Sequence, residues 1–171
     1  MVRRAKLVND AVDLVPVLQL FSTETYRRVY ETLLSEWKTL GELRELYGEG
    51  VEEALRILKN AGMLEVKWRM PTEPAGKPEK EYHVSYTHLS INVYISLKDL
   101  NTILNAIFMA EDEESEIVGR IAEQINRGRI SVQHISRETG MDSLFIRAVA
   151  KKSLRLNLKG QLVEFAREDE I

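Results

Sequence analysis

The chain has 171 residues, of which 44% are hydrophobic and 30% charged, and its formal net charge is -3. This composition is typical of a soluble globular protein, large enough for one core or two small ones. No apolar run approaches the roughly 20 residues of a membrane span and no signal peptide is recognisable, so we expect a cytoplasmic protein. The absence of cysteine excludes disulfides, thiol chemistry and cysteine-based metal or redox sensing.

The charge is divided unevenly along the sequence. Residues 1–116 carry 14 Lys or Arg against 20 Asp or Glu, whereas residues 117–167 carry 10 against 4. A basic surface attracts phosphate through a salt-dependent interaction that does not require a particular base sequence. The C-terminal part therefore has the more favourable charge for binding a polyanion.

The first expected elements are an apolar arm and a longer helix. Residues 5–20 are mostly apolar, with Pro16 inside, which favours a short helix or an arm that packs on the following domain. A second helix is expected from Ser22, a typical N-cap, to about residue 36, and it has a wide apolar face. Arg27 and Arg28 lie beside that face and are candidate DNA contacts.

Residues 39–62 have the pattern of a helix-turn-helix. Thr39 and Glu42 have the spacing of a capping box, and apolar residues then recur at helical intervals. A turn with two glycines precedes a second amphipathic helix, which Gly62 ends as a C-terminal cap.

A β-hairpin is expected next. Residues 64–70 alternate between apolar and charged side chains, which predicts a half-buried strand. Residues 71–78 include three prolines and predict a loop, and residues 82–87 alternate again. The pattern therefore predicts a wing beside the helix-turn-helix, followed by a third alternating run over residues 91–95.

Residues 18–87 resemble the ArsR-like winged-helix regulators of bacteria and archaea. The resemblance rests on residues 21–30 in the leading helix, on the Glu-Leu pair at 42–43, and on the leucine-rich helix and its Ala-Gly-hydrophobic exit at 55–64. It implies a winged helix-turn-helix that binds DNA as a transcriptional regulator. Some relatives sense metals through cysteines on the first helix of the motif; residues 44–46 are Arg-Glu-Leu here, which excludes that mode.

A helix over residues 97–110 is expected to carry a broad apolar stripe. The stripe must be covered either by its own domain or by a second copy of the chain. We favour the second copy, because symmetric readers pair with symmetric DNA sites. The acidic run at 111–114 is typical of a solvated helix N-terminus rather than of a metal site.

The C-terminal third contains a second helix-turn-helix signature. A helix over residues 115–127 precedes a short helix capped by Ser131, and Gly140 supplies the turn. The next helix spans residues 142–156, and residues 162–165 are expected to form a closing strand.

The two motifs differ in how well their charges suit DNA. Glu49, Glu52 and Glu53 lie at the start of the first candidate reading helix, where phosphate repels them. Arg147 and Lys151 lie one turn apart on a face of the second helix. Solvated surface positions are the alternative interpretation of these basic residues. The candidate DNA-binding residues are Arg27, Arg28, Arg56, Lys59, Lys67, Arg69, Lys77, Lys80, Ser143, Arg147, Lys151, Lys152 and Arg155.

The sequence offers no support for catalysis or for a cofactor. It has no Gly-rich phosphate loop, no nucleophile elbow and no spacing of its three histidines that assembles a metal site. We therefore expect a protein that is not an enzyme and has no cofactor and no metal.

Together these patterns predict an α+β, mainly α protein. A winged helix-turn-helix domain with a β-wing and an N-terminal extension spans residues 1–95, a linker or dimerisation helix spans 96–114, and a second helix-turn-helix-like helical domain spans 115–171. The expected function is sequence-specific binding of double-stranded DNA by a homodimeric transcriptional regulator, with an unknown effector and no membrane partner. The alternative is a tandem winged-helix adaptor that docks its acidic first motif onto a protein of the transcription machinery. Which motif reads DNA is left open by the sequence.

Overall fold

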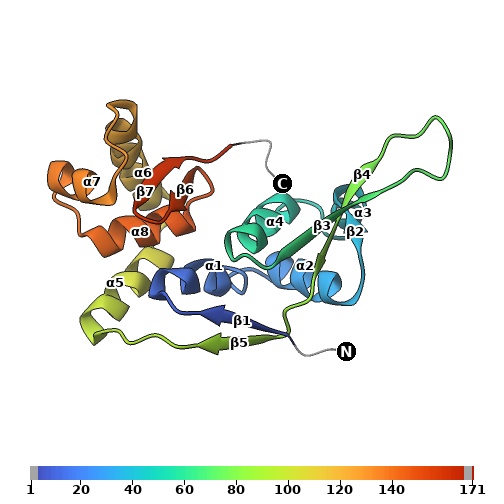
Figure 1. Ribbon diagram of the computed structural model, residues 1–171, viewed down its shortest axis with the longest axis horizontal. Helices are drawn as coiled ribbons and strands as arrows, with labels where there is room; N and C mark the ends of the chain where they lie inside the picture. The colour runs from blue at the N-terminus through green and yellow to red at the C-terminus, as the bar shows by residue number, and fades with distance from the viewer. Residues whose placement is uncertain (1–3, 168–170) are drawn as a thin grey trace. The chain divides into compact units, whose positions relative to one another are not determined.

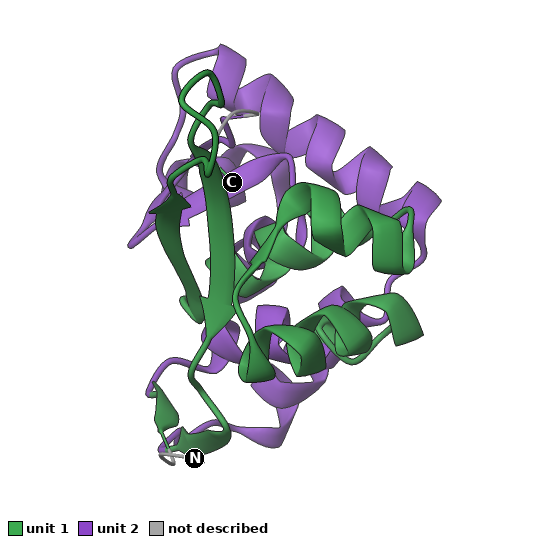
Figure 2. Cartoon of the chain, turned by 90° about the vertical axis from the view of Figure 1, so that its right-hand side faces the viewer, with its two compact units in different colours: residues 1–8, 19–91, 171 green, residues 9–18, 92–170 purple. Residues whose placement is uncertain are grey.

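The computed structural model describes residues 4–167 and 171 as a mixed α/β protein of helices and small sheets. It divides into two compact units (Figure 2): unit 1 holds residues 1–8, 19–91 and 171, and unit 2 holds residues 9–18 and 92–170. The contacts thus group residues 9–18 and the expected linker with the C-terminal part. Whether the chain folds as separate domains at 1–95, 96–114 and 115–171 stays a prediction.

Unit 1 contains a three-stranded antiparallel sheet with the order β2-β4-β3, packed with helices, and a separate parallel pair of strands (Figure 1). Its elements in chain order are β1 (Ala5–Val8), α2 (Glu24–Ser35), β2 (Lys38–Thr39), α3 (Leu40–Tyr47), α4 (Val51–Asn60), β3 (Leu64–Arg69), β4 (Glu79–Val84) and β5 (His88–Ile91).

Local signals fix the helices of unit 1. The predicted capping box before α3 is confirmed: the Thr39 hydroxyl accepts from the Glu42 N–H, and the Glu42 carboxylate accepts from the Thr39 N–H at 2.7 Å. Gly48 and Gly50 have φ of 68° and 87°, so the turn between α3 and α4 requires them. The N-cap of α2 is Thr23 rather than Ser22, because the Thr23 hydroxyl accepts from the backbone of the first turn.

Two strand expectations are wrong in detail. Residues 5–8 form strand β1 and not a short helix; β1 pairs in parallel with β5, in line with the alternative of an arm that packs on the domain. The third alternating run therefore pairs earlier than expected, at residues 88–91, because its partner comes from the N-terminus and not from the hairpin.

Unit 2 contains a short N-terminal segment, helices and a hairpin. Its elements are η1 (Ala11–Asp13), α1 (Leu14–Gln19), α5 (Leu97–Ile107), α6 (Glu111–Asn126), α7 (Val132–Thr139), α8 (Ser143–Lys152), β6 (Leu156–Lys159) and β7 (Leu162–Phe165). The last residue of α1 is counted in unit 1. A single core includes Val15, Ile103, Ile121, Ile146 and Val149.

The two units repeat one order of elements. We call residues 24–84 the first motif and residues 111–165 the second motif; each runs helix, short β segment, helix, helix and hairpin. Thr39 pairs with Glu81 in the second hairpin strand of the first motif, and Ser131 pairs with Leu162 at the matching place in the second. The second motif therefore has a two-stranded hairpin where the sequence indicated only one closing strand. Both motifs are consistent with a winged-helix-like fold.

Helix α5 is covered on one side within its own unit. Ile103 and Ala106 are buried in the core that α8 shares, so the chain itself covers this part of the stripe. Leu97 and Phe108, near the two ends of α5, remain 84% and 80% exposed. No helix among residues 4–167 is long and apolar enough to cross a bilayer.

Candidate nucleic-acid interface

Helix α4 is amphipathic and keeps one face open. Its buried side consists of Val51, Ala54, Leu55, Ile57 and Leu58. Glu53 and Lys59 are exposed, and Glu52, Arg56 and Asn60 are half-buried. The apolar side fixes the helix in unit 1, and the other side leaves polar side chains accessible to a partner.

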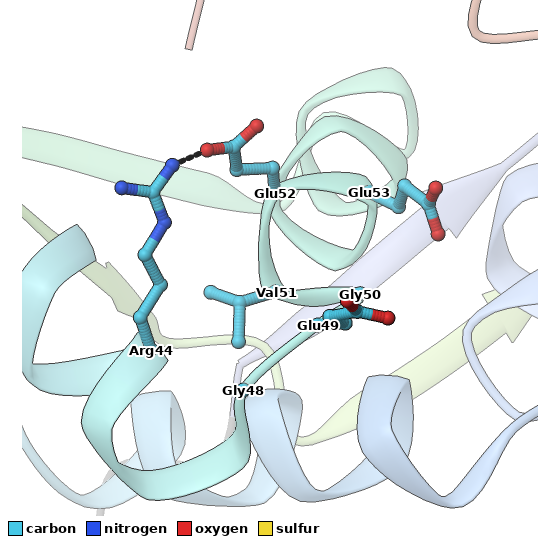
Figure 3. Close-up of a pocket in the computed structure, with 7 residues that line it drawn as sticks. All are labelled: Arg44, Gly48, Glu49, Gly50, Val51, Glu52 and Glu53. Atoms are coloured by element: carbon cyan, nitrogen blue, oxygen red, sulfur yellow. Dashed lines mark ion pairs between the residues drawn. The ribbon is translucent and has the colours of Figure 1, made fainter.

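The carboxylates at the start of α4 are largely held by neighbours. Glu52 forms an ion pair with Arg44 of α3, and the Tyr26 hydroxyl donates to the Glu53 carboxylate at 2.7 Å. Figure 3 shows Glu52 turned toward Arg44 and Glu53 pointing away from that pair. Because a guanidinium and a hydroxyl oppose two of the charges, the repulsion expected between this helix end and phosphate is reduced.

A hollow of about 450 Å³ lies at the turn between α3 and α4 (Figure 3). Its charged lining consists of Arg44, Glu49, Glu52 and Glu53, so it is acidic and unsuited to an anion. Across the described part of the chain, no group of three or more His, Asp or Glu side chains is placed to hold a metal ion.

One face of the β3–β4 hairpin is occupied by internal ion pairs. Arg69 Nε lies 2.6 Å from a Glu81 carboxylate oxygen, and Arg69 Nη1 lies 2.7 Å from Glu42. Lys67 Nζ lies 3.0 Å from the other Glu81 oxygen and 4.1 Å from the centre of the Trp37 ring. Arg69 thus ties strand β3 to the capping box of α3, and both predicted DNA contacts on this face already have anionic partners.

The pKa values reflect these pairs. The hydrogen bond from Arg69, followed by that from the Thr39 N–H, holds the pKa of Glu42 below its ordinary 4.5. The hydrogen bond from Lys67 lowers the pKa of Glu81 most, and Arg69 lowers it further. The two carboxylates raise the pKa of Arg69, so all three groups are charged at neutral pH.

The other predicted contacts of unit 1 lie on α2, α4 and the hairpin end. Arg27 and Arg28 are exposed and pair with glutamates one turn away on α2, a type of contact worth about 0.3–0.5 kcal/mol. Lys77 is exposed in the loop between β3 and β4. Lys80 Nζ donates to the main-chain oxygen of Ile171 at 2.5 Å and lies 5.9 Å from the centre of the Trp68 ring.

Helix α8 of the second motif is less accessible than α4: six of its residues are half-buried and four are buried. None of its ten residues, all of which the structure describes, is exposed. Arg147 Nη2 lies 2.5 Å from Asp10, and Lys151 Nζ lies 3.2 Å from Asp13. Lys152 Nζ lies 3.0 Å from Glu114 and donates to the Met109 carbonyl at 3.0 Å. The predicted basic stripe thus faces carboxylates of its own unit.

The Asp10–Arg147 pair is partly buried. The Arg147 side chain is 19% exposed and that of Asp10 is 45% exposed. Burial raises the pKa of the Asp10 carboxyl, but the hydrogen bonds from Arg147 and the Val12 N–H outweigh it and leave the pKa below 3.8. Of the other two candidates in the second motif, Ser143 is half-buried and Arg155 is exposed.

The structural units divide the charge differently from the halves of the sequence. Unit 1 has 13 Lys or Arg against 12 Asp or Glu, and unit 2 has 11 against 15. The reason is that unit 2 combines the basic C-terminal residues with residues 9–18 and with the acidic start of α6. The electrostatic advantage that the sequence indicated for the second motif is therefore absent when whole units are compared.

Sequence reasoning missed the carboxylates that cover α8. Asp10 and Asp13 lie in the mostly apolar segment 5–20, and their spacing of three matches one helical turn and so complements the spacing of Arg147 and Lys151. Trp68 was also missed as a surface residue, because its alternation with charged neighbours suggested a buried position; it is 62% exposed.

Paired helices followed by a hairpin are consistent with the class of winged-helix-like folds. The family model of the ArsR transcriptional regulator matches residues 8–167. The chain therefore belongs to the ArsR transcriptional regulator family, a family of regulators and not of enzymes. The resemblance predicted from residues 18–87 is confirmed, and it extends through the second motif. No curated protein sequence matches the chain.

Proposed function

We propose that this protein is a transcriptional regulator that binds double-stranded DNA sequence-specifically, and that it does so through the first motif. Both motifs have the element order of a winged helix, but of their last helices, α4 and α8, only α4 has exposed residues. The observation that carries the proposal is the contrast between α4, which has exposed residues on its polar side, and α8, whose residues are all half-buried or buried and whose cations pair with carboxylates of unit 2. Membership of the ArsR family supports the function in general.

The side chains of α4 suit a major groove. Arg56 and Lys59 can meet guanine acceptors or phosphates, and Asn60 can meet an adenine edge. A Glu side chain can accept from cytosine N4, so Glu49, in the turn before α4, would favour a C·G pair rather than prevent binding. Lys77, in the hairpin loop, would hold a phosphate beside the groove.

The proposal includes a homodimer. Leu97 and Phe108 leave part of the α5 stripe exposed, and a second copy is the partner that a two-fold DNA site requires. In that arrangement unit 1 of each protomer binds a half-site, and the α5 surface joins the protomers.

Selection of bound duplexes from a random pool by the full-length protein tests this proposal. We expect an enriched site with two half-sites separated by about one helical turn of DNA or a multiple of it. We also expect log affinity for that duplex to fall steeply with log salt, by about 0.9 for each phosphate contacted. Failure to enrich any sequence, together with salt-independent binding, would contradict the proposal.

A protein adaptor is the second candidate. The acidic lining of the hollow beside α4 favours it, because Glu49 and Glu53 would attract a basic protein segment. Retention on heparin and on a non-specific duplex distinguishes the two candidates: a DNA regulator is retained on both and elutes with salt, whereas an adaptor with an acidic docking face passes through.

A further inference from the structure

We infer that His83 is a protonation site through which pH regulates the affinity of unit 1 for DNA. The ring takes up a proton beside the base of the β3–β4 hairpin and adds one positive charge there. The effect on DNA rests on the proposed function, whereas the protonation itself does not. His83 lies on β4 directly opposite Glu65 of β3, and its side chain is 19% exposed.

A carboxylate oxygen faces a ring nitrogen of His83 that has no hydrogen bond. His83 Nδ1 is buried, and no described group is within hydrogen-bonding geometry of it. Glu65 Oε2 lies 3.5 Å away, while Glu65 Oε1 already accepts from Arg4 at 2.9 Å and from the Ser85 hydroxyl. The hydrogen bond from Ser85 keeps the pKa of Glu65 below its ordinary 4.5, so the carboxylate is charged where histidine titrates. A protonated ring would therefore form a charge-assisted hydrogen bond to Oε2.

The flat face of the His83 ring contacts an indole. Trp37, between α2 and β2, stacks on His83 with ring centroids 4.9 Å apart and planes inclined by 17°. Lys67 Nζ lies 4.1 Å from the centre of the same indole. A protonated His83 would also be attracted to the indole, and the two cations would repel each other. Protonation thus strengthens the contact with Glu65 and weakens the hold of Trp37 on Lys67.

The charges around the stack balance while His83 is neutral. Three carboxylates and three cations form one network of ion pairs on this face: Arg4, Glu42, Glu65, Lys67, Arg69 and Glu81. Lys38 of β2 is in register with Tyr82 and so lies on the opposite face of β4. The buried side chains of α2, which also packs on β4, are apolar. A proton on His83 consequently gives the network a net positive charge, which favours a polyanion.

Tryptophan fluorescence follows this proton directly. The chain has two tryptophans, so Trp37 is the only indole in full-length Trp68→Phe. A protonated imidazole quenches an indole stacked on it more strongly than a neutral imidazole does. We therefore expect Trp37 emission to fall in a single transition between about pH 8 and pH 5, the range in which histidine changes its charge.

The two other histidines of the chain provide matched controls. His83→Gln should abolish the transition, whereas His88→Gln and His134→Gln, both at exposed positions, should keep it. Glu65→Gln removes the charge that faces Nδ1, so the transition should move to lower pH. An NMR titration of the histidine ring protons in the parent protein gives the same information without depending on the folding of His83→Gln, and circular dichroism checks each variant.

The anisotropy of the selected duplex, rhodamine-labelled and titrated at constant ionic strength, measures the coupling to DNA. We expect the affinity to be about fivefold higher at about pH 5.5 than at about pH 8, and His83→Gln should lose most of this difference. Because coupling between two binding events is reciprocal, saturating duplex should raise the midpoint of the Trp37 transition by about 0.7 pH unit, which corresponds to the same fivefold ratio.

The outcomes separate this inference from the proposed function. A Trp37 transition that persists in His83→Gln, or no transition and no titrating His83 in the parent protein, would overturn the inference and leave the regulator standing. A duplex affinity that depends on pH equally in His83→Gln would do the same. Binding of no duplex at either pH would instead refute the proposed function and the coupling, while the fluorescence titration would still support the protonation site.

Discussion

The first and second motifs have the same order of elements but opposite accessibility at the reading helix. Helix α4 and helix α8 each have ten residues and follow a turn, yet α4 has exposed residues on its polar side and α8 has only half-buried and buried ones. The difference arises outside the motifs, because η1 and α5 supply additional surfaces around α8. A helix-turn-helix therefore identifies a possible reader, and the segments around it decide whether its reading face is available.

The corresponding sixth positions of the two helices show this contrast. The sixth residue of α4 is the half-buried Arg56, and that of α8 is Ala148, which is fully buried. The neighbours of α8 also supply partners for its basic side chains. These side chains form ion pairs with carboxylates of residues 10–13 and of α6. Under the proposed function, the second motif serves as a scaffold within unit 2.

The largest expected effect comes from placing a charge on the enclosed helix. Ala148→Arg inserts a long cation into a filled core, so we expect the free energy of unfolding to fall by about 3 kcal/mol or more. At the corresponding position of α4, Arg56→Ala should change the free energy of unfolding by no more than about 1 kcal/mol. Urea denaturation of both variants measures the difference, and equal stability of the two would show that α8 is not enclosed.

A smaller effect is expected from the Asp10–Arg147 pair. Because Asp10 is nearly half exposed, solvent screens the attraction between the two charges. We therefore expect a coupling free energy of about 1 kcal/mol between Asp10 and Arg147. A double-mutant cycle with Asp10→Asn and Arg147→Met measures it, with the exposed Arg27–Glu31 pair of α2 as the weaker reference. A coupling energy of zero would mean that this contact does not hold residues 9–18 on α8.

The smallest effect concerns acid stability. The pKa values of Asp10, Glu42 and Glu81 are lower in the folded protein than their ordinary values of 3.8 and 4.5. A lowered carboxyl pKa stabilises the fold above the ordinary value, and the stabilisation is lost as pH falls through the lowered one. Stability should therefore decrease below about pH 4.5, and Glu42→Gln should reduce the slope of that decrease. Denaturation midpoints as a function of pH test this, and an unchanged slope in Glu42→Gln would contradict the role of Glu42.

Short-range signals explain how much of the fold was predictable. The Thr39–Glu42 capping box and the turn glycines are defined by residues a few positions apart, so periodicity and caps located α3, α4 and the hairpin. The family resemblance followed from the same local patterns and is confirmed.

Long-range contacts explain what the sequence did not reveal. Strand β1 pairs with β5 across more than 80 residues, and Asp10 meets Arg147 across 137. No local periodicity encodes such pairings. The sequence therefore does not predict that residues 9–18 pack on α8, or that carboxylates of this segment pair with its basic side chains. The exposure of Trp68 was missed for a related reason: alternation assigns a residue to a face but does not tell where along the hairpin that face leaves the core.

The affinity of two double variants for the selected duplex tests the central claim most directly. Arg56→Ala with Lys59→Ala changes the open helix, and Arg147→Ala with Lys151→Ala changes the enclosed one, at equal loss of charge. Reading by the first motif predicts that the α4 variant loses about 10- to 100-fold in affinity and has a shallower salt dependence, while the folded α8 variant binds like the parent protein. The reverse result, with loss of binding only in the α8 variant, would contradict the account.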